Sequence, residues 1–423
     1  MQAFESRLEK VHALIHAIRA NRDNLIKIAV KDTGFTVREC NVEVDGILND
    51  LQRFENMAQT FALRRPVCEP DQTVALVLPY NGSAWLNTAI VSIYMVGNPV
   101  RVKFASRDSG IARFTESLYR PIFGDTIRFD FSDGRTFLQK AMTDPATPVI
   151  CLFGSDDYAG QYLDAIKAQG KKFVFEGPGK DPFIVLPEAD PETAARELAY
   201  CKYIYAGQTC TAPERVYVHR SVYDDFLKLF LDFSRAVKIG DPSDPTTDMG
   251  PIASTKAVKA IKAQLNDAVQ RGAQIALGGR IQGNWVYPTV VINARHDMLG
   301  MQEETFGPVS FIRTFHDTKE VLGLARDSRY GLRVSVYGDK AAVNLAEKLT
   351  GEPYCHRVPE ITYGRFGTAG VNQPQSEIWV DAFVSKPVGG YGLSGWIWET
   401  VGNEFIIKQG PKLLSLETSY PKD

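Results

Sequence analysis

The sequence has no apolar run long enough to cross a membrane. Its 423 residues contain no stretch of about 20 consecutive apolar side chains, which is the length that a spanning helix needs. The first residues, MQAFESRLEKVHALIHAIRANR, are amphipathic and lack the apolar segment of a secretory signal. We therefore expect a cytoplasmic protein with no membrane partner.

Positive charge is not in excess either. The formal net charge is −2, and no run of lysine or arginine forms a patch that could follow a phosphate backbone. The sequence predicts no nucleic-acid partner.

Cysteine and histidine are few and scattered. No two cysteines have CxxC spacing, and His12 and His16 form only an i, i+4 pair on an expected exposed helix face. A disulfide framework is disfavoured, no metal site is expected, and a special cysteine would have to act through its reactivity. The six cysteines are Cys40, Cys68, Cys151, Cys201, Cys210 and Cys355.

A large core is available, because 44% of the residues are apolar and only 23% are charged. The first 60 residues have apolar side chains at helical spacing, and Pro66 and Pro70 then break the pattern. From residue 74, short apolar runs (VALVL, PVRVKF, TIRFDF, PVICLFG, KKFVFE, PFIVL) alternate with helical stretches. This alternation predicts a parallel, doubly wound α/β sheet that binds ligands beyond the carboxyl ends of its strands.

The second half repeats the alternation with ERVYVH, VYPTVVI and VSFIRTF as its strands, which predicts a second α/β domain sharing a cleft with the first. The expected divisions are a helical arm at 1–60, a connector with oligomerisation strands at 61–73, a dinucleotide-binding domain at 74–176, a catalytic domain at 177–395, and a C-terminal return and oligomerisation tail at 396–423.

Cys210 lies in YAGQTCTAPERVYVH, a loop of small and polar residues that runs into a strand. A free cysteine is commonly buried as a small hydrophobe, which is the alternative to a nucleophile. The loop setting favours the nucleophile, because backbone N–H groups there can point at a ligand.

Glu176 ends the predicted strand KKFVFE and is followed by Gly177, Pro178 and Gly179. It is either a solvated residue at the end of a strand or a general base whose pKa is raised in a partly apolar cleft.

These segments resemble the aldehyde dehydrogenase superfamily, in the same order and over nearly the whole chain. GQTC at 207–210 is similar to the nucleophile loop of the family, and FEGPGKDPFIV is similar to its Glu-Leu-Gly-Gly-Lys motif. LPYN, VKFAS, FGS, EETFGP, SRYGL, GTAGVN and KPVGGYGLSG also match family motifs.

The resemblance implies NAD(P)-dependent oxidation of an aldehyde. Cys210 would attack the carbonyl, Asn81 and the Cys210 N–H would form the oxyanion hole, and Glu176 would activate the water that hydrolyses the thioester. The implied cofactor-binding residues are Lys103, Ser106, Gly154, Ser155, Glu304 and Phe306.

Each of three such residues also has an ordinary structural explanation. Asn81 precedes a glycine and would suit a tight turn, Lys103 would suit a solvated strand end, and Phe306 would suit core packing.

The chain departs from the family at several places. Ser106 occupies the position of the glutamate that grips the ribose 2′-hydroxyl in NAD-selective members, and Arg107 follows it, so we expect NADP, or NADP and NAD, as cofactor. Gly177-Pro178 stiffens the turn after Glu176. Trp396 and Trp398 replace a more usual Gly-Arg pair and suggest an aromatic lining of the substrate pocket.

Two other functions stay open at this point: an enzyme that passes the thioester to coenzyme A or runs in reverse as an acyl reductase, and a catalytically silent relative. The presence of both Cys210 and Glu176 favours hydrolysis. The extended segments FALRRPV and KLLSLETSY, together with the resemblance, predict a homodimer or homotetramer.

Overall fold

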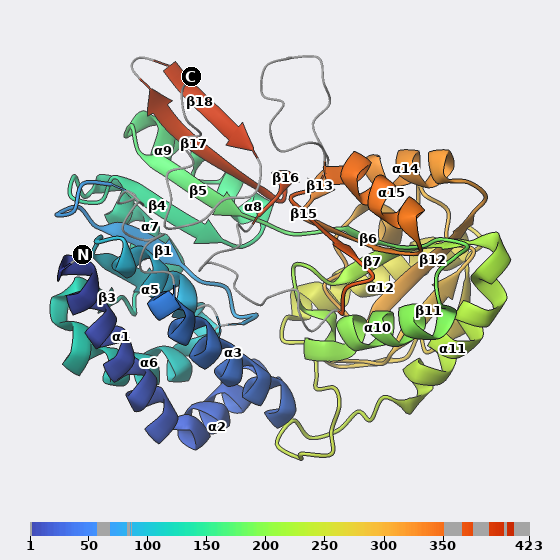
Figure 1. The fold of residues 1–423 in the computed structure, drawn as a ribbon, viewed down its shortest axis with the longest axis horizontal. Helices are drawn as coiled ribbons and strands as arrows, with labels where there is room; N and C mark the ends of the chain where they lie inside the picture. The colour runs from blue at the N-terminus through green and yellow to red at the C-terminus, as the bar shows by residue number, and fades with distance from the viewer. Residues whose placement is uncertain are drawn as a thin grey trace.

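The structure is a computed structural model that describes residues 2–56, 68–82, 85, 87–350, 366–374, 389–401 and 404–409. Two seven-stranded sheets form its framework, and each carries helices on both faces (Figure 1). This arrangement is the one that alternating strands and helices predict.

The first sheet has the order β18-β17-β5-β4-β1-β2-β3. The five strands from the first half of the chain, β1 to β5, are parallel to one another. The hairpin β17-β18 pairs with β5 through β17 in the antiparallel direction. The strands are β1 (Val74–Val77), β2 (Val100–Lys103), β3 (Ile127–Phe129), β4 (Val149–Phe153), β5 (Lys172–Glu176), β17 (Gly395–Val401) and β18 (Glu404–Gln409).

Alternating side chains of this sheet enter two separate cores. Val74, Leu76 and Val100 pack against the helices of the N-terminal arm, whereas Ala75 and Ile150 face the opposite side. The helices of the first face are α1 (Gln2–Ala20), α2 (Arg22–Thr33), α3 (Val37–Asn56), α5 (Asn87–Met95) and α6 (Ser109–Phe123); those of the second face are α7 (Gly134–Thr143), α8 (Asp156–Gly160) and α9 (Leu163–Ala168).

The second sheet has the order β15-β14-β6-β7-β12-β11-β8, and only β8 runs antiparallel to its neighbour. The strands are β6 (Asp181–Val185), β7 (Pro213–His219), β8 (Gln274–Leu277), β11 (Thr289–Ile292), β12 (Val309–Phe315), β14 (Arg333–Tyr337) and β15 (Thr368–Val371). Two short antiparallel pairs complete the strands: β9 (Ile281–Gln282) with β10 (Trp285–Val286), and β13 (Tyr330–Gly331) with β16 (Tyr391–Gly392).

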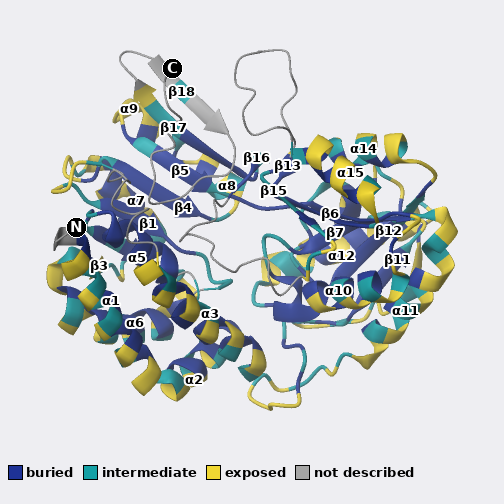
Figure 2. Cartoon of the chain, viewed as in Figure 1, coloured by how far each residue is buried: buried dark blue, intermediate teal, exposed yellow. Residues whose placement is uncertain are grey.

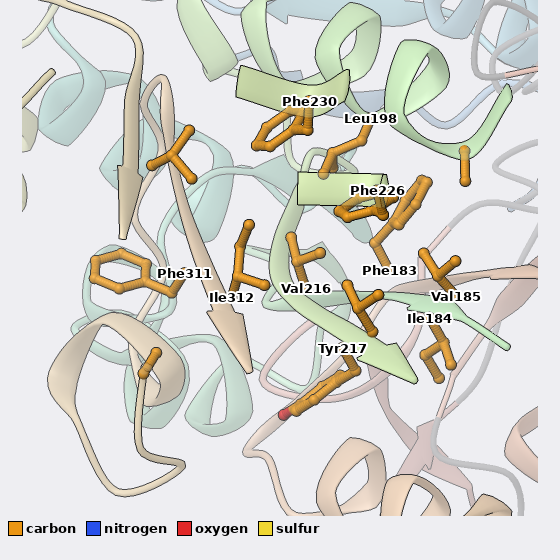
Figure 3. Close-up of a cluster of buried hydrophobic side chains, with 14 of the residues drawn as sticks. Phe183, Ile184, Val185, Leu198, Val216, Tyr217, Phe226, Phe230, Phe311 and Ile312 are labelled. Carbon is orange, nitrogen blue, oxygen red and sulfur yellow. The ribbon is translucent and has the colours of Figure 1, made fainter. Parts of the chain in front are cut away.

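Aromatic and branched side chains fill the core of the second sheet. In Figure 3, Phe183 and Val216 point to the helix side, where Phe226 and Phe230 pack, and Tyr217 lies on the other face. In Figure 2 the central strands of both sheets are dark blue while the outer faces of the helices are yellow, so the helices turn their apolar stripes to the sheets. The helices are α10 (Pro191–Tyr203), α11 (Tyr223–Ala236), α12 (Thr255–Gln270), α13 (Leu299–Gln302), α14 (Thr318–Arg326) and α15 (Lys340–Thr350).

The chain passes between the two sheets through the short turn 177–180, which joins β5 to β6. It crosses again near Ser394, between β16 and β17. Both crossings lie beside the carboxyl end of β5, because Gly395 pairs with Glu176.

The predicted α/β class with parallel sheets is confirmed. The expected oligomerisation segments FALRRPV (61–67) and KLLSLETSY (412–420) lie outside the described residues, as does Cys355.

Candidate active site

A cavity of about 1170 Å³ lies where the two sheets meet. The first sheet presents the carboxyl ends of β1, β2, β4 and β5 to it, and the second presents the amino ends of β14 and β15. All nine residues singled out from the sequence are in its wall: Asn81, Lys103, Ser106, Gly154, Ser155, Glu176, Cys210, Glu304 and Phe306.

The loop that carries Cys210 is held in a constrained backbone conformation. Tyr205 (φ 54°) and Ala206 (φ 53°) are left-handed, and so is Gly207 (φ 72°). For the two non-glycine residues this conformation costs on the order of 1 to 3 kcal/mol each, so the surrounding contacts must hold it.

Gln208 supplies several of those contacts from within the loop. Its side-chain Nε2 donates to the Tyr205 carbonyl at 2.9 Å, and its Oε1 accepts from the Ala253 N–H at 2.8 Å and from the Tyr80 hydroxyl at 3.2 Å. The buried amide therefore fixes the loop to both sides of the cleft.

Glu39, near the start of α3, adds a contact from the N-terminal arm. Its carboxylate accepts from the Thr36 N–H at 2.7 Å, which caps the helix, and also from the Tyr205 N–H. Burial raises the pKa of Glu39 to about 7, although the two backbone donors lower it.

The turn after Glu176 passes directly against the Cys210 loop. A Cβ atom at Gly179 would collide with the Cys210 carbonyl, and one at Gly177 would collide with the Leu393 carbonyl. Only glycine allows this approach, so the Gly177-Pro178-Gly179 sequence has a packing reason.

Ser394 fastens the same turn to the second crossing of the chain. Its Oγ donates to the Pro178 carbonyl at 2.6 Å and accepts from the Gly331 N–H at 3.0 Å, and its carbonyl accepts from the Gly177 N–H at 3.1 Å. Ser394 is fully buried.

The thiol of Cys210 is half-buried in the cavity wall. Burial raises its pKa well above the ordinary value, and the negative charges of Glu176, Asp181 and Glu304 raise it further. Glu176 and Cys210 both line this cavity.

Sequence reasoning missed a buried charge cluster below the site. Lys180 donates to Glu214 Oε2 at 2.8 Å, and Lys202 lies 4.0 Å from Glu214 Oε1. Burial works against the Glu214 charge, but Lys180 and Lys202 hold its pKa below its usual range. In the sequence Glu214 stands at the start of the strand PERVYVH, which also contains Arg215 and His219, so the glutamate alone did not mark the cluster.

Glu214 also explains the conformation of the loop at 304–306. It accepts from the N–H groups of Thr305 and Phe306, both at 2.7 Å, and Phe306 has a left-handed φ of 51°. The ring of Phe306 meets Tyr80 edge-on, with ring centroids 6.1 Å apart.

Glu304 faces the turn after Glu176, and its Oε1 accepts from the Gly179 N–H at 3.1 Å. Burial raises the pKa of Glu304 well above its ordinary value, and the Glu214 charge adds to this effect.

The candidate cofactor residues at the ends of β2 and β4 are in defined contacts. Lys103 is buried and donates through Nζ to the Phe104 carbonyl at 2.5 Å, so it is not the solvated strand-end lysine of the ordinary explanation. Ser155 caps α8, with its Oγ accepting from the Tyr158 N–H at 3.3 Å.

Arg107, which follows Ser106, is held by backbone carbonyls in this structure. Its guanidinium donates to the carbonyls of Asp32 and Ala253 and lies over the ring of Tyr80, 5.2 Å from the centroid. Among the described residues, Arg107 is not part of the cavity wall, because its donors are directed to these backbone oxygens.

The expected aromatic lining from Trp396 is also wrong. Trp396 packs against Phe173 and Phe175, with ring centroids 5.2 and 4.8 Å away, in the core on the α7–α9 side of the first sheet. The alternation of β17 turns this ring to that core, and Trp398 stacks beside it with centroids 5.0 Å apart.

In the described part of the chain, no helix is both long and apolar enough to span a bilayer.

Comparison with known proteins gives a consistent result. The family model described as "Aldehyde dehydrogenase family" matches residues 2–406. A succinate-semialdehyde dehydrogenase [NADP(+)] of Mycobacterium avium is 27% identical over 92% of this chain and 88% of its own length. A D-glyceraldehyde dehydrogenase (NADP(+)) of Thermoplasma acidophilum is 29% identical over 74% of this chain and 68% of its own length.

Solved structures share the fold. The succinic semialdehyde dehydrogenase of Streptococcus pyogenes, solved with NADP+, aligns with a TM-score of 0.83 at 24% identity, covering 98% of this chain and 88% of that one. A betaine aldehyde dehydrogenase of Staphylococcus aureus, solved with NAD+, aligns with a TM-score of 0.80 at 24% identity, over 99% and 85% of the two chains.

Proposed function

Because the chain belongs to the aldehyde dehydrogenase family, we propose that it oxidises an aldehyde to a carboxylic acid, with Cys210 as nucleophile and Glu176 as the base of the hydrolytic step. The contact of the Glu176 turn with the Cys210 loop carries this proposal. Gly179 can pass the Cys210 carbonyl only without a Cβ, and this brings the segments of both residues together in one cavity wall.

In the first half of the reaction the Cys210 thiolate attacks the aldehyde carbon and forms a thiohemiacetal. The new oxyanion would receive hydrogen bonds from the Asn81 side-chain amide and the Cys210 N–H; one such donor is typically worth about 3 to 4 kcal/mol. Loss of a hydride from this adduct leaves a thioester on Cys210.

In the second half, Glu176 removes a proton from water, which attacks the thioester and releases the acid and the thiolate. The raised pKa of Cys210 means that the thiol must lose its proton before it attacks the aldehyde.

The cavity suits a dinucleotide in its size and in its polar groups. Lys103 and Ser106 would hold the adenosine ribose, Gly154 and Ser155 the pyrophosphate, and Glu304 and Phe306 the nicotinamide end. When bound, the nicotinamide accepts the hydride. We propose NADP as the preferred cofactor, since Ser106 puts no carboxylate where a 2′-phosphate would lie, and several relatives are NADP(+) enzymes.

The assembly we propose is a homodimer or homotetramer. β18 is an edge strand of the first sheet in the described chain and offers its free side to a second subunit. Five free cysteines in the described residues support a reducing compartment such as the cytoplasm.

Steady-state assays with purified protein test the reaction. The wild type should reduce NADP in the presence of an aldehyde, Cys210→Ala should abolish this, and Glu176→Gln should slow turnover and leave an acylated protein detectable by mass. A requirement for added coenzyme A would show acyl transfer instead, and inactivity of the wild type with every aldehyde would favour the silent relative.

A further inference from the structure

A buried glutamate connects the loop that carries Cys210 to the loop at 304–306. Glu214 follows Cys210 along the chain, near the start of β7, and is only 1% exposed. In the described part of the chain it is not one of the residues that line the cavity. Glu214 can therefore influence the reaction only through other residues.

Both oxygens of the Glu214 carboxylate hold the backbone of the loop at 304–306. Oε2 accepts from the Thr305 N–H and Oε1 accepts from the Phe306 N–H, each at 2.7 Å. Phe306 has a left-handed φ of 51°, a conformation that a non-glycine residue keeps only where its surroundings hold it. The two hydrogen bonds from successive N–H groups to one carboxylate supply this constraint.

The charge environment keeps both oxygens available as acceptors. Lys180 Nζ donates to Oε2 at 2.8 Å, Lys202 Nζ lies 4.0 Å from Oε1, and both lysines are fully buried. A carboxylate that only neutralised Lys180 would need no bond from Oε1 to the loop, yet Oε1 accepts from the Phe306 backbone. The contacts of Glu214 are those of an ionised anchor for the loop.

Side chains fix the same loop further. Thr305 Oγ1 accepts from Lys180 Nζ at 2.9 Å and donates to Gln264 Oε1 at 2.8 Å. Gln264 Nε2 donates to the Glu304 carbonyl at 2.9 Å. Glu304 and Phe306 line the cavity, so these contacts and those of the carboxylate decide where the two side chains stand in it.

The two loops also touch directly. A Cβ atom at Gly207 would collide with the Gly307 carbonyl, so the backbones pass against each other. In the proposed reaction a hydride leaves the adduct on Cys210 for a nicotinamide held by the loop at 304–306, and such a transfer needs both partners in a fixed geometry. Glu214 joins one loop through the chain and the other through its carboxylate.

We propose that Glu214 is a positioning residue for hydride transfer, which sets the loop at 304–306, and with it the nicotinamide of bound NAD(P), against the adduct on Cys210. The adduct loses the hydride, its oxyanion becomes the thioester carbonyl, and Glu214 exchanges neither a proton nor an electron. This inference rests on the proposed function, in which Cys210 carries the adduct.

Cofactor binding tests this role without turnover. Dissociation constants are measured for NADPH and for 2′,5′-ADP, which has the 2′-phosphate but no nicotinamide. Glu214→Gln has one acceptor oxygen in place of two, so it should weaken NADPH binding about tenfold and leave 2′,5′-ADP binding unchanged. A lower folded fraction alone would reduce the binding of both ligands to the same extent.

Glu214→Asp keeps a charge beside Lys180, and it replaces Glu214→Gln if that variant fails to fold. Because it is one methylene group shorter, it cannot reach both N–H groups and should also weaken NADPH selectively. Equal weakening of the two ligands, or wild-type affinity for NADPH in the folded variants, overturns the proposal.

The matched control is Glu320→Gln. Glu320 also pairs with a cation, Arg313, and accepts a backbone N–H, that of His316 at 2.9 Å, but among the described residues it is not in the cavity wall. This variant should bind NADPH and 2′,5′-ADP as the wild type does.

Hydrogen exchange gives a readout that needs no cofactor. In Glu214→Gln the amides of Thr305 and Phe306 should exchange roughly tenfold faster than in the wild type, because their acceptor is weakened. In Glu320→Gln the His316 amide should exchange faster instead. Unchanged exchange at Thr305 and Phe306 would show that other contacts hold the loop, and the proposal would fail.

Single-turnover kinetics separate this role from the proposed function. At saturating NADP the first appearance of NADPH should slow about tenfold in Glu214→Gln, since the nicotinamide is less well placed. A wild type that oxidises no aldehyde but shows the expected binding and exchange differences would refute the proposed function and support the role of Glu214. A first turnover as fast in Glu214→Gln as in the wild type would refute that role alone.

Discussion

At the scale of single residues, the electrostatics of Cys210 give a prediction with a definite sign. The pKa of the thiol is raised first by burial and then by Glu176, so replacing that carboxylate by an amide removes a source of repulsion for the thiolate. Glu176→Gln should therefore speed alkylation of Cys210 while it slows hydrolysis of the thioester.

The measurement is the rate at which iodoacetamide modifies the Cys210 peptide, followed by mass spectrometry without cofactor. Because only the thiolate reacts, the wild-type rate should rise about tenfold per pH unit from about pH 7 to pH 8.5 without a plateau. Slower alkylation of Glu176→Gln would mean that Glu176 promotes ionisation of the thiol rather than opposing it.

A candidate residue can be recognised from the sequence only when a short sequence pattern around it marks it. Cys210 and Glu176 stand in short, unusual loops next to strands, and such loops can be recognised without coordinates. Glu214 could not be recognised in this way, because its partners Lys180 and Thr305 are 34 and 91 residues away. The contacts of Arg107 could not be recognised in this way either, since the carbonyls of Asp32 and Ala253 are 75 and 146 residues away.

At the scale of elements, the buried charge cluster joins β6, β7 and the loop at 304–306. Glu214→Gln should destabilise the protein by about 3 to 5 kcal/mol, since it leaves Lys180 buried without its anion. The expected readout is the denaturant midpoint. The control Glu192→Gln breaks an exposed pair with Arg196 on α10 and should cost less than about 1 kcal/mol. Equal costs would show that the cluster adds no stability.

Ser394 connects β13 to the turn after Glu176 through its hydroxyl. Ser394→Ala breaks hydrogen bonds to Pro178 and Gly331 inside a dry core, so we expect a loss of about 2 to 3 kcal/mol and slower thioester hydrolysis. Ser243→Ala, on an exposed loop, is the control. Hydrolysis at the wild-type rate in Ser394→Ala would show that Glu176 does not depend on this contact.

Element types were the easiest part to predict. Strands such as VALVL and PVICLFG are apolar throughout because both faces of a parallel sheet are covered. The face of the sheet on which Trp396 lies could not be predicted from the sequence. It depends on the register in which β17, a strand from the C-terminal part of the chain, pairs antiparallel with β5, because this register decides which core the ring enters.

At the scale of the whole molecule, Glu39 links the N-terminal arm to the loop that carries Cys210, and it should make stability depend on pH. Its folded pKa of about 7 lies above its ordinary value of 4.5, so the folded state retains a proton that the unfolded chain loses. Stability should therefore fall as pH rises from about 4.5 to 7, by on the order of 3 kcal/mol, and remain low above that range.

Denaturant midpoints measured across this pH range test the effect. Glu39→Gln cannot ionise and should flatten the decline, whereas the exposed control Glu347→Gln should keep it. A decline of the same size in Glu39→Gln would assign it to other groups.

The two places where the chain passes between the sheets set how the molecule can move. Glu176 ends a strand of the first sheet, Cys210 lies in the loop before a strand of the second, and the turn at 177–180 and the crossing near Ser394 are two connections between these halves. Any rocking of one half against the other must alter the gap between base and thioester. Under the proposed mechanism, water activation should therefore depend on closure of the halves, and a ligand that draws them together should speed the release of the acid.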